Sequence, residues 1–157
     1  MRAERDAVDV EADVDVDVDA DAVGMSGNDR PVRVRVRVCE YATLIPGRGV
    51  AVLLPDRAQA AVFRTLDGRL FAVGNHDPAT GASVISRGLT GSRDGAATVA
   101  SPMLKHVYEL ATGRCVDGPA GPEPFTLPTY PVYCDAGVVY LRTAPGPDSP
   151  TVAGGTP

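Results

Sequence analysis

Residues 60–73 read AAVFRTLDGRLFAV, two short apolar runs joined by the turn-like stretch Leu66-Asp67-Gly68-Arg69. Valine and phenylalanine in the runs suit a pleated strand, and Asp-Gly suits a tight turn because glycine accepts a positive φ. The stretch therefore predicts a β-hairpin with strands at Ala60–Arg64 and Leu70–Val73. Because similar short runs recur along the chain, this hairpin indicates the fold class.

The same alternation of short apolar runs and turn residues extends in both directions. Val32–Val38 alternates Val with Arg at the two-residue period of a half-buried strand, and Val50–Leu54 follows as a second strand. Residues 75–95 read as loop, and residues 41–45 carry a weak helical signal. Further strands are expected at Thr98–Ala100, Val107–Leu110, Val132–Cys134 and Val138–Leu141. Eight or nine short strands predict an all-β, antiparallel sandwich or barrel of two sheets.

Both ends of the chain differ in composition from this region. Residues 1–30 carry ten acidic and three basic residues, and the stretch 9–22 reads DVEADVDVDVDADA. Aspartate disfavours strands and neighbouring like charges repel, so we expect residues 1–30 to form a disordered acidic tail. Residues 31–142 are then the folded domain, and residues 143–157 a flexible Pro/Gly-rich tail. Met25, just before the patterned region, is a candidate alternative start.

The composition also argues against several classes of function. The cysteines are odd in number and widely spaced, which fits neither a disulfide framework nor a metal motif. The arginines of Val32–Val38 form the one basic stripe, so we expect no nucleic-acid partner. The chain has no signal-peptide pattern and no run of 18 apolar residues. We therefore expect a cytoplasmic protein without a membrane segment.

Two stretches resemble the cluster-binding loops of Rieske domains. They are residues 71–82, FAVGNHDPATGA, and residues 100–120, ASPMLKHVYELATGRCVDGPA. In Rieske domains the first loop reads Cys-X-His-X-Gly and the second Cys-X-X-His, and together they hold a two-iron cluster. The resemblance places these residues at the four ligand positions: Asp77, Ala79, Ser101 and Leu104.

The residues at these degenerate ligand positions argue against a cluster. Alanine and leucine cannot ligate iron, and aspartate and serine are poor substitutes for thiolates. We therefore expect no catalytic residue, metal or cofactor on this chain. Asp77 can accept backbone N–H groups in a turn, and Leu104 can fill the space of the cluster. A packed structural joint of this kind predicts that Leu104→Ala costs about 2–5 kcal/mol.

The order of three short motifs is more specific than either loop alone. Asn75-X-Asp77-Pro78-X-X-Gly81, Ser86-Arg87-Gly88 and Ser101-Pro102-X-Leu104-Lys105 are similar to the small subunit of assimilatory NAD(P)H-dependent nitrite reductases. That family is a Rieske-like domain without the cluster, and the resemblance covers residues 32–142. It implies an accessory subunit that supports reduction of nitrite to ammonium in nitrate assimilation by docking to a large catalytic subunit.

The resemblance also implies where the redox groups and the docking contacts lie. FAD, an iron–sulfur cluster and sirohaem are expected on the large partner subunit and none on this chain. The loop tips are the expected docking surface, with three candidate contacts: Arg87, Lys105 and His106. Two alternatives stay open: a Rieske-type [2Fe-2S] ferredoxin-like electron carrier, and a binding module for another oxidoreductase.

Overall fold

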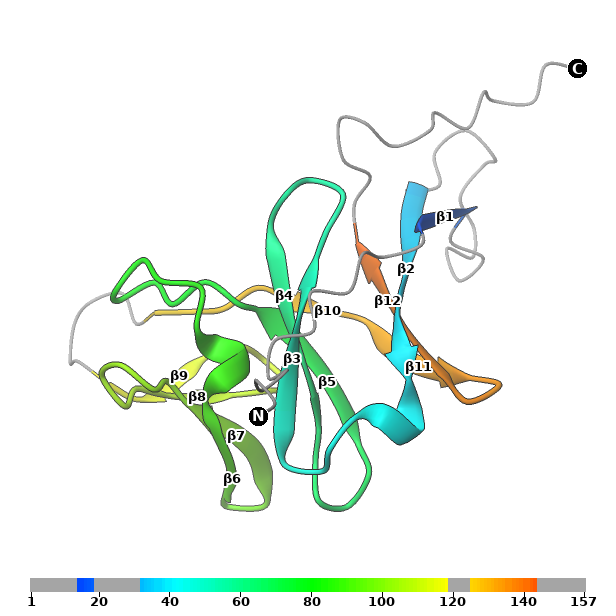
Figure 1. The fold of residues 1–157 in the computed structure, drawn as a ribbon. Helices are drawn as coiled ribbons and strands as arrows, with labels where there is room; N and C mark the ends of the chain where they lie inside the picture. Colours follow the sequence, from blue (N-terminus) through cyan, green and yellow to red (C-terminus); the bar gives the residue numbers. More distant parts are fainter. Residues whose placement is uncertain (1–13, 19–31, 119–124, 144–157) are drawn as a thin grey trace, which may run out of the picture.

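The computed structural model describes residues 14–18, 32–118 and 125–143. The described chain forms three four-stranded antiparallel sheets and two single-turn 3-10 helices (Figure 1). Among these residues, no helix is long and apolar enough to cross a membrane.

The first two sheets combine strands that are distant in sequence, whereas the third is formed by four consecutive strands. The first has the order β1-β2-β12-β11, with bounds Val14–Val18, Val32–Glu40, Val138–Thr143 and Val132–Asp135. The second has the order β10-β5-β4-β3, with bounds Thr129–Tyr130, Leu70–Gly74, Gln59–Arg64 and Arg48–Leu53. The third has the order β6-β7-β8-β9, with bounds Leu89–Arg93, Ala96–Ala100, Val107–Glu109 and Cys115–Asp117. The 3-10 helices are η1, Tyr41–Thr43, and η2, Ile85–Arg87.

The second sheet is buried on both faces, which explains the unbroken apolar run of β4. Ala60 and Val62 belong to a core shared with β2 and β12. Ala61 and Phe63 belong to a second core shared with β7 and β8. A strand covered on one face only would alternate apolar and polar residues, whereas all four of these are fully buried. The second sheet is therefore the central layer, with a core on either side.

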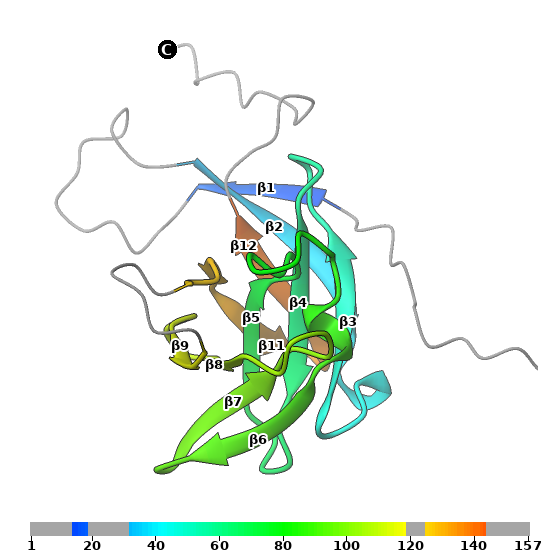
Figure 2. The same cartoon turned by 90° about the vertical axis from the view of Figure 1, so that its left-hand side faces the viewer.

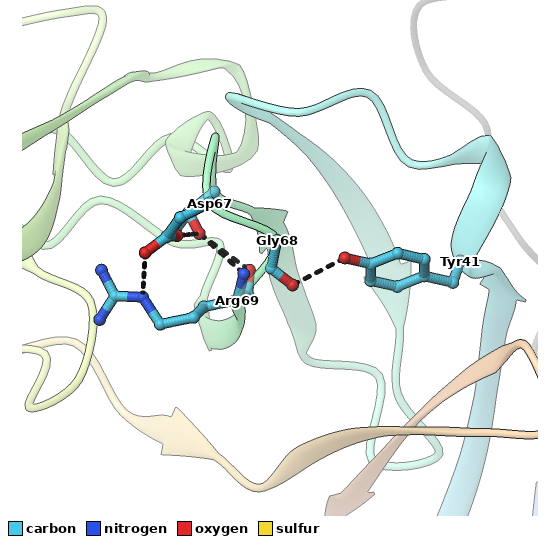
Figure 3. Close-up of polar contacts among 5 residues, drawn as sticks. Tyr41, Asp67, Gly68 and Arg69 are labelled. Atoms are coloured by element: carbon cyan, nitrogen blue, oxygen red, sulfur yellow. Dashed lines mark hydrogen bonds and ion pairs between the residues drawn. The ribbon is translucent and has the colours of Figure 1, made fainter.

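The predicted hairpin is confirmed, and its turn is anchored from outside. β4 and β5 pair from Ala60 with Gly74 to Arg64 with Leu70. Gly68 has φ +89°, and its N–H donates to the Thr65 carbonyl at 3.0 Å. The Tyr41 hydroxyl of η1 donates to the Gly68 carbonyl at 2.7 Å (Figure 3). The predicted short helical segment at 41–45 is thus a 3-10 turn tied to this hairpin.

The other predicted strands are also present, but the number of sheets is three rather than two. Four observed strands were not predicted: β1, β6, β9 and β10, each of which lies at the edge of its sheet. β6 contains Gly91 and is largely exposed, so it lacks the apolar alternation that marks a strand in sequence. It forms because each of its five residues pairs with a residue of β7.

The acidic N-terminal segment contains a strand where the sequence predicts no fixed structure. Val14–Val18 forms β1, which pairs antiparallel with Val32–Val36 of β2 (Figure 2). The Asp/Val alternation has the period of a strand, and pairing with β2 outweighs the low strand propensity of aspartate. Residues 1–13 and 19–31, including Met25, and residues 144–157 lie outside the described residues. The predicted tails there stay predictions.

Gly113, between β8 and β9, holds the third sheet against β10 and the segment before it. Its φ is +76°, its N–H donates to the Glu109 carbonyl at 2.8 Å, and its carbonyl accepts the Leu127 N–H at 2.7 Å. A Cβ at this position would lie 2.0 Å from the Leu127 carbonyl oxygen. Gly81 has a similar φ of +77° but has open space around the Cβ position.

We expect Gly113→Ala to destabilise the fold more than Gly81→Ala. Both substitutions place alanine at positive φ, which costs roughly 1–2 kcal/mol. Gly113→Ala adds an overlap with backbone atoms, worth about 1–3 kcal/mol more. The measurement is the free energy of unfolding in urea for both variants. Equal losses would mean that the Gly113–Leu127 approach is not a tight constraint.

Candidate functional site

Two loops meet at one end of the molecule, on the left in Figure 1 and towards the viewer in Figure 2. Loop 1 (residues 75–82) follows β5, and loop 2 (residues 101–106) joins β7 to β8. In loop 1, the Asp77 N–H donates to the Ala82 carbonyl at 2.8 Å. In loop 2, the Ser101 N–H donates to the His106 carbonyl at 2.8 Å. Asp77 and Ser101 thus each close their own loop.

The side chains of Asp77 and Ser101 also join the two loops to each other. The Ser101 hydroxyl donates to Asp77 Oδ2 at 2.5 Å, and the Ala79 N–H donates to Asp77 Oδ1 at 2.9 Å. Both residues have 0% exposed surface. The predicted role of Asp77 as an acceptor of backbone N–H groups in the loop is confirmed. Two of the four degenerate ligand positions therefore form one buried hydrogen bond.

Two ionisable side chains of the interior near this bond, Tyr108 and Cys115, have raised pKa values. Tyr108 is fully buried, and its hydroxyl has no hydrogen-bond partner within the part of the chain that the structure describes. Burial, and then the negative charge of Asp77, raise the pKa of the Tyr108 hydroxyl well above its usual value. Burial likewise raises the pKa of the Cys115 thiol. A protonated thiol is neither a good nucleophile nor a good metal ligand.

The prediction that Leu104 fills the space of the missing cluster is wrong. Leu104 is 54% exposed, and its neighbour Met103 is 56% exposed. Asp77 and Ser101 bond to each other directly, and the Leu104 side chain lies outside this contact, in solvent. Loop 2 forms a tight turn in which the Lys105 N–H donates to the Ser101 carbonyl at 3.0 Å. The tip of loop 2, with Met103 and Leu104, is exposed to solvent. Leu104→Ala is accordingly expected to cost little stability.

The four ligand positions do not fit a two-iron cluster. Ala79 and Leu104 carry no ligand atom, and the Ser101 hydroxyl and the Asp77 carboxylate are already hydrogen-bonded to each other. Across the described ranges, no three His, Cys, Asp or Glu side chains gather as metal ligands. No step of any reaction can be assigned to iron bound by these residues.

Asn75 is a positioning residue. It belongs to one of the three sequence motifs, but the motif does not reveal its hydrogen-bond partners. Its Oδ1 accepts the Ser86 N–H at 2.7 Å, and its Nδ2 donates to Gln59 Oε1 at 2.9 Å. Asn75 is almost fully buried, so these bonds replace the water it would otherwise bind. It connects loop 1 to η2 and thereby sets the position of Arg87. The motif spacing places Asn75 and Ser86 eleven residues apart, which gives no signal of the contact.

Beside the buried bond lies an exposed surface of apolar and cationic side chains, here called the loop-end surface. Its members are Arg87, Leu89, Met103, Leu104 and Lys105, all exposed. Gly88 allows the segment 87–89 to approach the end of β7, from which loop 2 starts, because a Cβ at Gly88 would lie only 2.5 Å from the Ala100 carbonyl oxygen. His106, the third expected docking residue, is half-buried and stacks on Phe125 with ring centroids 5.8 Å apart.

Comparison with known proteins places this geometry in a family. The model of the Rieske-like [2Fe-2S] domain matches residues 35–142. The chain is 37% identical over 106 residues to the nitrite reductase (NADH) small subunit of Escherichia coli K12, covering 67% of this chain and 94% of the relative. A crystal structure assigned as an NADH-dependent nitrite reductase small subunit from Mycobacterium tuberculosis is 44% identical, with TM-score 0.66, over 71% of this chain and 96% of that chain.

A third similarity is to part of a much longer protein. The nitrite reductase [NAD(P)H] large subunit of Klebsiella oxytoca is 35% identical over 88 residues, which is 56% of this chain and 9% of that protein. These matches agree in sequence and in fold with the three-sheet domain and its two loops. The chain therefore belongs to the Rieske-like [2Fe-2S] domain family and, within it, to the small subunits of NADH-dependent nitrite reductase.

Proposed function

We propose that this chain serves its nitrite reductase as a cluster-free accessory subunit that docks onto the large catalytic subunit through the loop-end surface. The observation that carries the proposal is the buried Asp77–Ser101 hydrogen bond, which occupies two positions where a Rieske cluster needs ligands. In a chain of this family, such a bond leaves contact with a partner as the available role.

The Klebsiella oxytoca relative supports association with a large subunit. There, a segment similar to this chain makes up 9% of a nitrite reductase [NAD(P)H] large subunit, so the two kinds of domain share one polypeptide. Domains that are joined in one protein commonly associate when they are separate chains. The proposal places FAD, the iron–sulfur cluster and sirohaem on that partner and, with it, this chain in the cytoplasm.

The Asp77–Ser101 bond supports the docking role by holding the two loops in one arrangement. A buried carboxylate is costly unless it is hydrogen-bonded, and here it accepts from both a hydroxyl and a backbone N–H. A hydrogen bond to a charged group contributes roughly 1.5–3 kcal/mol. A joint of this strength fixes the loop tips without metal and presents a preorganised surface to a partner.

The loop-end surface has the chemistry of a protein interface. Leu89, Met103 and Leu104 expose apolar area that a partner can bury, and Leu89 is 79% exposed. Arg87 and Lys105 add positive charge at the rim, which favours an acidic patch on the partner. Methionine and arginine are enriched at interfaces, whereas clustered exposed leucines are uncommon on monomers.

Removing the Ser101 hydroxyl tests the contribution of the Asp77–Ser101 hydrogen bond to stability. We expect Ser101→Ala to lower the free energy of unfolding by about 2–3 kcal/mol, because it leaves the buried Asp77 carboxylate short of a hydrogen bond. The matched control is Ser92→Ala at an exposed position, expected within about 0.5 kcal/mol of wild type. Denaturant unfolding measures both, and equal stability of the two variants would remove the joint from the proposal.

Metal content separates the proposed function from an electron carrier. We expect the purified chain to contain far less than stoichiometric iron and acid-labile sulfide and to lack visible absorption. Stoichiometric iron with sulfide would instead identify a ferredoxin-like carrier. Recovery of a different oxidoreductase with the tagged full chain would favour a binding module for that enzyme.

Docking is tested with exposed leucines at two ends of the molecule. We expect Leu104→Asp to weaken binding to the purified large subunit by about tenfold or more, equivalent to about 1.4 kcal/mol. Leu66→Asp is the control, because Leu66 is 85% exposed in the β4–β5 turn, at the opposite end of β5 from loop 1. Titration calorimetry and NADH-dependent nitrite reduction by the mixture provide the readouts. Equal effects of the two substitutions would argue against the loop-end surface.

A further inference from the structure

Strand β2 carries arginine at every second residue of its first half. Val34 and Val36 are fully buried in the core, and Arg33 and Arg35 alternate with them, half-buried. On the β12 side, the register sets Arg142 directly opposite Arg35. Like charges directly opposite on neighbouring strands destabilise a sheet. The register therefore places two guanidinium groups at neighbouring positions of the sheet.

Aromatic rings keep these arginines in place without removing their charge. The Arg35 guanidinium lies 4.6 Å from the centroid of the Tyr140 ring, and that of Arg142 lies 5.3 Å from the Tyr133 ring. The two tyrosine rings stack on each other at 5.7 Å. Cation–π contacts orient a guanidinium but leave its net charge unchanged. The outer side of the first sheet is thus an ordered cationic and aromatic surface.

Strand β1 supplies the opposite charge at matching positions. The backbone register pairs Asp15 with Arg35 and Asp17 with Arg33. One row across the sheet therefore reads Asp15, Arg35, Arg142. Because Asp and Val alternate throughout residues 13–19, a slip of two residues would again set an aspartate opposite each arginine. The pairing of aspartates with arginines therefore depends on the alternating charge pattern more than on one unique register of β1 with β2.

β1 also covers a strand edge. In the sheet order β1-β2-β12-β11, the nine-residue strand β2 would be an edge strand without β1. An edge exposes unpaired backbone N–H and C=O groups and recruits other strands, a hazard for a valine-rich sequence. The acidic strand β1 pairs with this edge along Val32–Val36.

We propose that the outer edge of β2 is a charge-selective strand-docking site, and that the chain's own acidic Asp/Val segment is the ligand that covers it. The segment supplies backbone pairing to the edge and balances the Arg35–Arg142 pair. Because its specificity is electrostatic, salt weakens the cover. The proposal is independent of docking through the loop-end surface, which lies on a different side of the molecule (Figure 1).

Hydrogen exchange in the full chain tests the site. We expect Asp15→Lys/Asp17→Lys to speed exchange of the Val32–Val36 amides that face β1 by about threefold to thirtyfold, the range for two exposed ion pairs. The matched control, Glu4→Lys/Asp6→Lys, changes net charge equally at residues outside β1 and should leave these amides unchanged. Amides of β4 report on global stability and are expected to be unaffected in both variants.

Swapping the charges between β1 and β2 provides the decisive experiment. Adding Arg33→Asp/Arg35→Asp to the Asp15→Lys/Asp17→Lys variant restores opposite charges in the same register and should restore slow exchange. Three results would overturn the proposal. They are unchanged amide hydrogen exchange in Asp15→Lys/Asp17→Lys, an equal effect of the Glu4→Lys/Asp6→Lys control, and no return to slow hydrogen exchange in the charge-swapped variant. Protection that rises with protein concentration would also overturn it, because the covering strand would then come from a second copy.

Discussion

The burial of the central sheet on both faces is the constraint on which the rest of the structure depends. Ala60–Phe63 is fully buried because the first sheet covers one face of β4 and the third sheet covers the other. Neither outer sheet could bury its apolar residues without this layer. The arrangement also brings the two loops together, because loop 1 leaves the end of β5 and meets loop 2 from the third sheet.

At that meeting point a hydrogen bond takes the place of a metal. A cluster would join the two loops through four ligand bonds, whereas here Asp77 and Ser101 join them through one short buried contact. This hydrogen bond joins loop 1 to loop 2 through side chains alone. Asn75 adds a second fixed point by binding the Ser86 N–H, so η2 and Arg87 move with loop 1. Both hydrogen bonds therefore connect the loop end to the rest of the domain.

The sequence predicts those parts of the fold whose local pattern and tertiary role agree. The hairpin 60–73 and the Val/Arg strand are of this kind, and so is the absence of ligand atoms at Ala79 and Leu104. β6 was not predictable, since its residues are exposed and only pairing with β7 makes them a strand. Burial of Leu104 was wrongly predicted because the direct Asp77–Ser101 contact depends on tertiary geometry. The acidic strand β1 likewise forms by pairing with β2, which the local sequence of residues 14–18 does not reveal.

The two surfaces of this domain place charge in different ways. At the loop end, Arg87 and Lys105 are exposed beside apolar side chains, so a partner can gain both burial and charge pairing there. On the outer side of the first sheet, the arginines are stacked on tyrosines and matched in register with aspartates of the same chain. A surface whose arginines stand in register with aspartates of the same chain would gain less from a new partner. The proposed docking site and the proposed cover of β2 would together direct association towards the loop end and away from the arginine-rich edge.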